Sequence, residues 1–292
     1  MLFLGLIWSF QQIALKATAD DFSPMLQIAV RSGAGALLLA IFMRWRGESL
    51  LPERAHWKAG SAVGALFALE YVFVGEGLQH TSAAHMVVFL YTAPIFAALG
   101  LHWKLPSERL EPLQWFGIVA AFAGIVIAFM PGGAQPPEGS ARILWGDFLG
   151  LLGGLAWAAT TIVIRASSLS RLPATQTLMF QLIAAFVLLL PVATVLGHSR
   201  FEPSPLVWAG LAYQCIVMSF FSFLLWFWML RTYVASQLGV LTFVTPLFAV
   251  ALGALLLDET IERRFLVGTL MVAIGIVLVT GRGLLHRHGR RQ

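Results

Sequence analysis

Two stretches of the chain, YTAPIFAALGLHWKLPSERL at residues 91–110 and FVTPLFAVALGALLLDETI at residues 243–261, are copies of one pattern. Each has a proline early in a long apolar run and a glutamate close to the end of that run. Pro94 aligns with Pro246 and Glu108 with Glu259, at offsets of 152 and 151 residues. Because ordered matches at a nearly constant spacing indicate an internal repeat, we predict two related halves.

Further matches extend the repeat in both directions. The tripeptide FLG occurs at 3–5 and at 148–150, Arg31 falls opposite Gln181, and a glycine pair recurs at the 151-residue offset, as Gly117, Gly124 and Gly268, Gly275. Small residues allow helices to approach closely, so these glycines are predicted to form packing faces within the chain or in a dimer. Glu108 and Glu259 each precede a helix, whose N-terminal dipole favours a carboxylate.

Composition identifies the solvent of the chain. Of its 292 residues, 59% are hydrophobic and only 11% are charged, against roughly 25% charged in a soluble domain. A soluble enzyme, a DNA-binding domain and a secreted module are therefore excluded. A single cysteine rules out an intrachain disulfide, and neither a phosphate-binding glycine loop nor a histidine spacing suited to a metal is present. We predict no cofactor and no metal.

The apolar runs predict ten membrane-spanning helices, since about 20 apolar residues cross a bilayer. They cover roughly 2–17, 24–43, 57–79, 82–103, 113–130, 145–164, 174–196, 205–230, 235–257 and 264–281. The fold class is thus an all-α membrane protein. The chain divides into a first five-helix repeat at 1–131, a linker at 132–144, a second repeat at 145–281 and a basic tail at 282–292.

An odd number of helices in each copy has a consequence for topology. The second copy enters the membrane from the side opposite to the first, so the two halves are predicted to be inverted repeats. This architecture is that of secondary transporters, with the substrate site near the membrane midplane between the halves. An intramembrane enzyme would require a nucleophile and base, or metal ligands, at depth, and the sequence offers neither.

Basic residues predict the orientation. With the N-terminus inside, thirteen of the 19 lysines and arginines lie near inner ends of spans and five near outer ends. This bias favours both termini in the cytoplasm. The tail HRHGRR at 286–291 is then expected to face anionic membrane lipid rather than nucleic acid.

Several motifs resemble one family. They are WSFQQIALK at 8–16, AVRSGAGALLL at 29–39, SERLEPLQWFG at 107–117 and DETIERRFLVG at 258–268, together with the helices of Pro94 and Pro246. The chain resembles the EamA-type drug/metabolite transporter superfamily over essentially its whole length. The resemblance implies ten helices in two five-helix repeats. The aromatic content is most similar to bacterial amino-acid exporters, including the aromatic amino-acid exporter, and implies a bacterial inner membrane.

Pro94 and Pro246 are expected in the middle of membrane helices. A proline there removes one backbone hydrogen bond and crowds the carbonyl four residues earlier, at Leu90 and Thr242. Distorted backbone at membrane depth is tolerated where it faces protein or a cavity. Symmetry-equivalent prolines favour a pair of hinges over static kinks.

Candidate cavity-lining residues occur in equivalent helices of the two halves. Trp8 and Gln12 share a stripe of the first helix with small residues, and Gln11 faces its neighbour row. Trp157 and Thr161 occupy the corresponding stripe of the sixth helix. A large aromatic side chain and an amide beside small residues predict the wall of a cavity.

Arg31 and Glu70 are charges within predicted spans, where each costs about 2.5–3.5 kcal/mol and requires a partner. One interpretation is an ion pair between Arg31 and a carboxylate. The other is that Arg31 binds a substrate carboxylate, or that Glu70 carries a proton. Eight further residues are candidates for hydrogen bonding to or stacking on a substrate: His85, Tyr91, Thr92, Tyr213, Gln214, Phe223, Gln237 and Thr242.

The sequence therefore predicts a secondary transporter that exports small metabolites by alternating access. Amino acids, with aromatic or large apolar ones favoured, are the expected substrates, because one embedded arginine does not suit phosphorylated cargo. Glu70 or His85 is a candidate for proton coupling. A multidrug or other metabolite exporter, a channel-like pore and a non-transporting membrane partner remain alternatives, as do a monomer and a homodimer.

Overall fold

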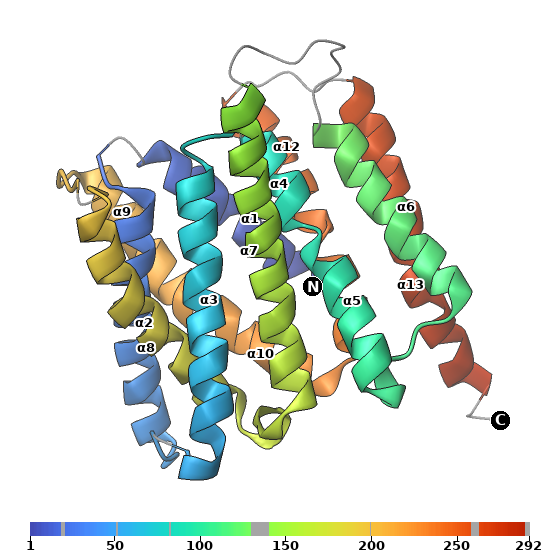
Figure 1. Ribbon diagram of the computed structural model, residues 1–292, viewed down its shortest axis with the longest axis horizontal. Coiled ribbons are helices and arrows are strands. Elements are labelled where there is room, and N and C mark those ends of the chain that lie inside the picture. Colours follow the sequence, from blue (N-terminus) through green and yellow to red (C-terminus); the bar gives the residue numbers. More distant parts are fainter. Residues whose placement is uncertain are drawn as a thin grey trace.

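The computed structural model describes residues 1–18, 21–50, 52–81, 83–129, 140–198, 200–257 and 263–289. Within these ranges the chain is helical, and no β-strand forms beyond one isolated antiparallel bridge between Phe22 and Phe201. Figure 1 shows the N-terminus near the middle of the molecule and α13 at one edge.

The first half contains six α-helices. They are α1 (Leu2–Ala17), α2 (Pro24–Trp45), α3 (Trp57–Gly77), α4 (Ala83–Leu90), α5 (Ala93–Lys104) and α6 (Pro112–Phe129). Two 3₁₀ turns precede α3 and α6, namely η1 (Arg54–His56) and η2 (Pro106–Glu108).

The second half contains seven α-helices and two shorter helical elements. They are α7 (Ser140–Ala166), the 3₁₀ turn η3 (Ser168–Arg171), α8 (Ala174–Val195), α9 (Pro205–Tyr213), the π-helix η4 (Gln214–Ser222), α10 (Phe223–Thr232), α11 (Ala235–Leu241), α12 (Val244–Leu257) and α13 (Arg263–Gly289).

Every predicted span coincides with helix in the structure, but three of the spans are not one regular α-helix. The fourth span is divided into α4 and α5, and the ninth into α11 and α12. The eighth span is continuous but passes through the π-helix η4. Six of the described helical stretches are long and apolar enough to cross a membrane: Pro24–Trp45, Arg54–Gly77, Met86–Lys104, Ala141–Ala166, Ala174–Val195 and Pro205–Thr232.

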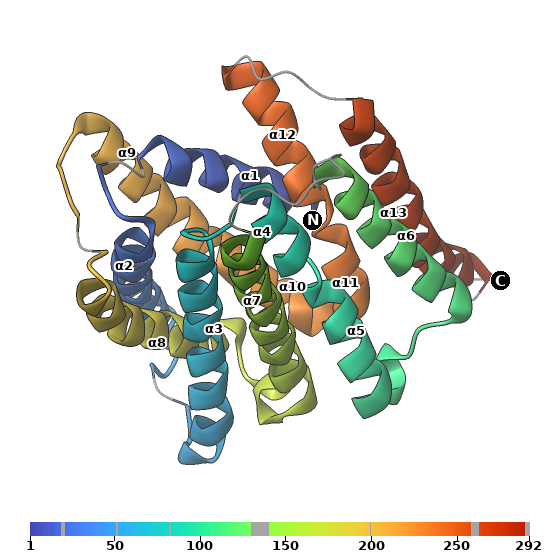
Figure 2. The ribbon, with the colours of Figure 1, turned by 45° about the horizontal axis from the view of Figure 1, so that its top comes forward.

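The helices of the two halves interlock. At one edge of the molecule α2 packs against α8, and at the other α6 packs against α13, as both views show (Figures 1 and 2). Between these edges α3 contacts α7 and α8, while η4 contacts α1 and α2. In addition, α5 contacts α7 and α1 contacts α12. Each of these contacts joins an element of the first half to one of the second.

The outer surface is apolar. Leu37 of α2, Phe116 of α6 and Leu270 of α13 are each about three-fifths exposed, at 63%, 63% and 62%. Large exposed apolar areas are rare on soluble monomers and are expected where lipid is the solvent. The surface therefore agrees with the low charge content of the sequence.

Glycines allow α6 and α13 to pack closely. Gly117 lies against Gly275 and Gly124 against Gly268, so that a Cβ atom at Gly124 would stand 2.6 Å from the Gly268 carbonyl oxygen. The repeated glycine pairs thus form a contact between helices of the same chain, as one of the two sequence interpretations predicted. A second copy of the chain is not needed to cover these faces.

We expect Gly124→Ala to destabilise the fold by about 1–3 kcal/mol, because the added methyl group meets backbone that cannot move aside easily. The measurement is the apparent melting temperature of the detergent-solubilised protein, followed by tryptophan fluorescence. Gly210→Ala is the matched control, since its Cβ would meet only Thr18 at 3.5 Å. Equal melting temperatures for the two variants would show that the crossing tolerates a larger separation.

Candidate functional site

The helix interruptions lie at the two prolines that the sequence singled out. Residues 91–92 separate α4 from α5, and Pro94 occupies the first turn of α5. Residues 242–243 separate α11 from α12, and Pro246 follows in the first turn of α12. The expectation of prolines within continuous kinked helices is therefore corrected: at a helix start the missing proline N–H has no intrahelical partner to lose.

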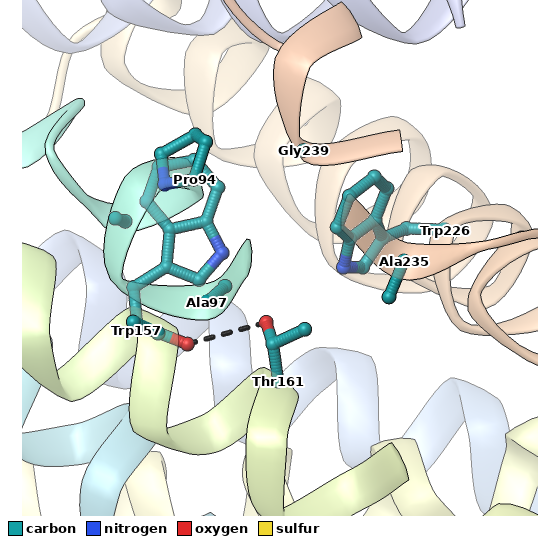
Figure 3. Close-up of a pocket in the computed structure, with 9 residues that line it drawn as sticks. Pro94, Ala97, Trp157, Thr161, Trp226, Ala235 and Gly239 are labelled. Carbon is teal, nitrogen blue, oxygen red and sulfur yellow. Dashed lines mark hydrogen bonds between the residues drawn. The ribbon is translucent and has the colours of Figure 1, made fainter. Parts of the chain in front are cut away.

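A small cavity lies beside the first interruption. Its wall combines α5, α7, α10 and α11 through Ala93, Pro94, Ala97, Trp157, Ala158, Thr161, Trp226, Ala235 and Gly239. Figure 3 shows the indole rings of Trp157 and Trp226 on opposite sides of this space, with Pro94 next to Trp157. We call it the central cavity. Its volume of about 10 Å³ admits about one water molecule, so the walls are closed on one another in this conformation.

Three predicted site residues line this cavity, namely Pro94, Trp157 and Thr161. Thr161 does not direct its hydroxyl proton into the space, because the hydroxyl donates to the Trp157 carbonyl oxygen at 3.2 Å. Tyr91 stands behind Trp157, with ring centroids 5.7 Å apart in an edge-to-face arrangement. These residues come from both halves of the chain, as a site between the repeats requires.

Trp8 reaches the same region from α1. Its indole N–H donates to the Ser222 hydroxyl at 3.1 Å, and its ring meets Trp226 edge to face at 5.3 Å. Trp8 was predicted to line a cavity; it is not among the residues that line the central cavity, and it contacts the cavity residue Trp226 instead. Trp226 itself was part of an aromatic run in the sequence, and its periodicity did not distinguish it from the neighbours that face outward.

A second polar centre surrounds Arg31. The guanidinium is fully buried; it donates to the Tyr71 hydroxyl at 3.1 Å and, at the long distance of 3.5 Å, to the Gln214 amide oxygen. Its carbon lies 5.4 Å from the ring centre of Tyr71 and 5.9 Å from that of Phe223. We call Arg31, Tyr71, Gln214 and Phe223 the Arg31 cluster.

A chain of hydrogen bonds orients this cluster from the far side. The Gln214 amide N–H donates to the Gln27 amide oxygen at 2.6 Å. Gln27 in turn donates to the Thr18 hydroxyl at 3.0 Å and to the Phe22 carbonyl oxygen at 2.6 Å. The side-chain amides of Gln27 and Gln214 thus form hydrogen bonds within the protein. Gln27 orients Gln214, whose amide oxygen faces Arg31.

The Arg31 guanidinium keeps unused capacity. Within the described part of the chain, its Nε has no hydrogen-bond partner and no carboxylate lies at ion-pair distance from it. Glu70, the embedded carboxylate singled out in the sequence, is half-buried in α3. A direct Arg31–carboxylate bridge, one of the two sequence interpretations, is therefore not formed with Glu70. A buried arginine with a free N–H can donate a hydrogen bond to an anionic ligand.

The π-helix η4 contacts α2 through its first residue and α1 through its last. This rare helix form often occurs at functional sites. Its first residue contacts Arg31 of α2, whereas its last accepts the hydrogen bond from Trp8 of α1. No periodic signal in the sequence predicted this widened turn.

Glu108 is the centre of a third polar group. Its carboxylate is fully buried and accepts from Arg165 Nε at 2.9 Å and from the same guanidinium through a second, very short contact. It also accepts from the backbone N–H groups of Ala235 and Ser236, at 3.0 and 3.4 Å, and from the Ser236 hydroxyl at 3.3 Å. We call Glu108, Arg165, Ala235 and Ser236 the Glu108 cluster.

Glu108 therefore does stabilise a helix N-terminus, but that helix is α11 and not the following α6 as the sequence suggested. Arg165 extends the cluster by donating to the Leu230 carbonyl oxygen at 2.6 Å, near the end of α10. The cluster joins the ends of α7 and α10 to the start of α11, one helical turn from Thr161 of the central cavity. Glu259, its sequence counterpart, lies outside the described residues.

Other described residues predicted for the site, Gln11, Tyr213, Gln237 and Thr242, do not line the central cavity. Gln11 is buried in α1, and Tyr213 donates its hydroxyl proton to the Ile7 carbonyl oxygen at 2.9 Å. Thr242 donates to the Gly239 carbonyl oxygen at 2.6 Å, and Gln237 is half-buried in α11. The side chains of Gln12 and His85 lie outside the described part. Among the described residues, no group of three His, Cys, Asp or Glu is placed to hold a metal ion.

An apolar helical bundle with interrupted helices around an internal cavity defines a multi-pass membrane transporter. The chain belongs to the EamA-like transporter family, whose sequence model matches residues 1–130 and 144–281. The resemblance noted from the sequence motifs is thereby confirmed.

Relatives agree with this assignment. The "uncharacterized transporter YoaV" of Bacillus subtilis is 24% identical over 283 residues, which cover 94% of this chain and 93% of the relative. The "uncharacterized inner membrane transporter YedA" of Escherichia coli is 24% identical over 284 residues, covering 95% and 88%. A solved structure titled "Crystal structure of protein" superimposes with a TM-score of 0.80 at 18% identity, covering 96% of both chains, and supports the fold alone.

Proposed function

We propose that this protein is a secondary transporter of the bacterial inner membrane that exports small carboxylate-bearing metabolites, with aromatic or large apolar amino acids first. The observation that carries the proposal is the fully buried Arg31, whose Nε has no partner within the described residues and whose guanidinium lies between two aromatic rings. A carboxylate held by this guanidinium would leave the substrate side chain among aromatic residues.

Inverted repeats are supported by how equivalent elements pack. The second helices of the two halves, α2 and α8, contact each other, and so do the last helices, α6 and α13. Contacts of α3 with α7 have a counterpart in those of η4 with α1. Such reciprocal pairing is expected of halves related by a two-fold axis in the membrane plane. Ten crossings would leave both termini on one side, which the basic residues favour as the cytoplasm.

The two internal sites suit the two ends of an aromatic amino acid. Phe223 of the Arg31 cluster and Trp226 of the central cavity are three residues apart on α10 and so lie on neighbouring positions of one helix face. Trp8, Trp157 and Trp226 offer apolar and aromatic surface. A single embedded arginine does not suit phosphorylated cargo, whose charge demands several cations.

Alternating access would open the central cavity, which is too small for a metabolite in the present conformation. The interruptions between α4 and α5 and between α11 and α12 are the proposed pivots, because short turns replace the regular helix there. The Glu108 cluster holds the ends of α7, α10 and α11 together on the side assigned to the cytoplasm. We propose that this conformation is closed on that side.

The decisive experiment uses the purified full chain in liposomes. Labelled phenylalanine, tryptophan, leucine and a dipeptide are offered in counterflow, with and without a pH gradient. Saturable exchange of an amino acid supports the carrier. Unsaturable flux would indicate a pore, exchange restricted to cationic drugs would indicate a multidrug exporter, and the absence of flux for every solute would contradict transport. If a pH gradient drives exchange by the wild type but not by Glu70→Gln, proton coupling through Glu70 is supported.

We expect Pro94→Ala to reduce exchange at least roughly tenfold while membrane insertion is retained. The substitution removes the ring that would clash with the Leu90 carbonyl in a continuous helix, so α4 and α5 could join and stiffen the proposed hinge. Initial rates in liposomes of matched protein content measure the effect. Pro191→Ala is the control, since Pro191 lies exposed inside α8, away from the central cavity. Wild-type exchange by the Pro94 variant would remove the hinge from the mechanism.

A further inference from the structure

A groove separate from the central cavity opens where α2 and α10 end and α8 begins. Its volume is about 360 Å³. One wall is apolar and consists of Phe221, Leu224, Leu225 and Trp228, of which Phe221 and Trp228 are 47% and 50% exposed. Arg46 and Arg231 also line the groove. The groove thus combines an apolar wall with two cationic side chains.

The charges in the groove do not balance. Glu48 also lines it, but one oxygen of this carboxylate pairs with Arg46 Nε at 3.0 Å and the other accepts from the Thr175 hydroxyl at 2.6 Å. Arg231 is exposed, and within the described part of the chain it makes no hydrogen bond or ion pair. Two guanidinium groups and one carboxylate, which already has partners within the protein, leave a net positive charge among the residues that line the groove.

The position of the groove relates these features to a membrane. Trp228 meets Tyr233 edge to face at 6.3 Å, an aromatic pair of the kind found at membrane–water interfaces. The apolar wall belongs to the helical stretch Pro205–Thr232, which is long enough to span a bilayer. Arg46 follows the stretch Pro24–Trp45 and Arg231 lies in the last turn of Pro205–Thr232. Both ends are on the side assigned to the cytoplasm, where anionic lipid is concentrated.

We propose that this groove binds one anionic phospholipid. The phosphate diester contacts Arg231 and the outer N–H groups of Arg46, and one acyl chain lies along Phe221, Leu224, Leu225 and Trp228. A guanidinium and a phosphate match in charge and in hydrogen-bond geometry. A zwitterionic lipid adds its own cation at the arginines, and a free phosphate lacks the chain that the apolar wall accommodates. This lipid site does not depend on the proposed transport function.

The test is native mass spectrometry of the full chain in detergent, titrated with phosphatidylglycerol or with phosphatidylcholine of the same acyl chains. We expect a one-to-one adduct with phosphatidylglycerol at concentrations roughly tenfold lower than with phosphatidylcholine. Arg231→Gln is expected to weaken phosphatidylglycerol binding roughly tenfold, as the loss of one charge-assisted hydrogen bond predicts. Trp228→Ala is expected to weaken it as well, by removing apolar contact.

Arg44→Gln is the matched control, because Arg44 is exposed at the same end of α2 but does not line the groove. Its binding of phosphatidylglycerol is expected to equal that of wild type. Equal losses in the Arg44 and Arg231 variants would overturn the site in favour of general charge attraction. Adducts that form with both lipids at the same concentration would also overturn it. So would displacement of phosphatidylglycerol by an equal concentration of glycerol phosphate. Melting temperatures verify that each variant is folded.

Discussion

Replacing Arg31 by Gln is expected to move half-saturation of exchange to substrate concentrations roughly 10–150-fold higher than in the wild type. The substrate carboxylate would lose a charge-assisted hydrogen bond worth about 1.5–3 kcal/mol, which corresponds to a roughly 10–150-fold weaker affinity. Arg31→Lys is expected to restore little, because an ammonium cannot donate at once to Tyr71, Gln214 and a ligand in the planar arrangement of the guanidinium. Substrate titrations of exchange rate in liposomes measure the change.

Stability separates this role from a purely structural one. If Arg31 served only to hold α2, α3 and η4 together, its removal would lower the melting temperature. Because its Nε has no partner within the described residues and one of its two hydrogen bonds is long, we expect a small change instead. Arg200→Gln, which alters an exposed arginine, is the control for both readouts. A large drop in melting temperature together with wild-type affinity in the folded fraction would make Arg31 structural.

Replacing Glu108 by Gln is expected to have the largest effect on stability, about 3–5 kcal/mol, because it leaves the Arg165 guanidinium without its buried counterion. The backbone N–H groups of Ala235 and Ser236 lose their anionic acceptor at the same time. Thermal unfolding of Glu108→Gln, Arg165→Gln and the double variant measures the coupling. We expect the double variant to be more stable than the sum of the single losses predicts, by about 0.5–3 kcal/mol. Strict additivity would contradict a direct energetic link.

The Glu108→Gln variant also tests whether the Glu108 cluster closes the path from the cytoplasmic side to the central cavity. Ala158 lines the central cavity and is 2% exposed, so a cysteine placed there in a Cys215→Ser background is expected to react slowly with a membrane-impermeant thiol reagent. Adding Glu108→Gln is expected to accelerate labelling from the cytoplasmic side. Glu53→Gln, an exposed carboxylate change, is expected to leave the labelling rate unchanged. Unchanged labelling in the Glu108 variant would show that the cluster stabilises the fold without closing the path.

Helix positions could be predicted closely from the sequence because the length of an apolar run is a local property. The second, third and sixth spans were expected at about 24–43, 57–79 and 145–164, and the structure has helices at Pro24–Trp45, Trp57–Gly77 and Ser140–Ala166. The repeated prolines also indicated where the fourth and ninth spans are interrupted. They did not distinguish a kink from a complete break, since that depends on whether neighbouring helices fill the gap.

The site was predictable only in part. Arg31 could be singled out because a charge in an apolar run is conspicuous, and Trp157 because it shares a stripe with small residues. Their partners could not be found in the same way. Tyr71 and Gln214 lie 40 and 183 residues from Arg31 in the chain. Gln214 was a candidate as a polar group in an apolar helix, but no motif identifies either residue as a partner of arginine. Trp226 likewise stands in a run of aromatic residues, and only packing against Trp8 turns it inward.

By itself the sequence determined a membrane-embedded helical chain and its family, and it predicted two related halves, because hydrophobicity and motifs are local features of the chain. Only the tertiary structure decided which polar groups meet. It assigned Glu108 to the start of α11 and to Arg165, left the Arg31 Nε without a partner among the described residues, and closed the central cavity. The physical reason is that a buried polar group must be satisfied by whatever packing brings near it, and that packing joins residues far apart in sequence.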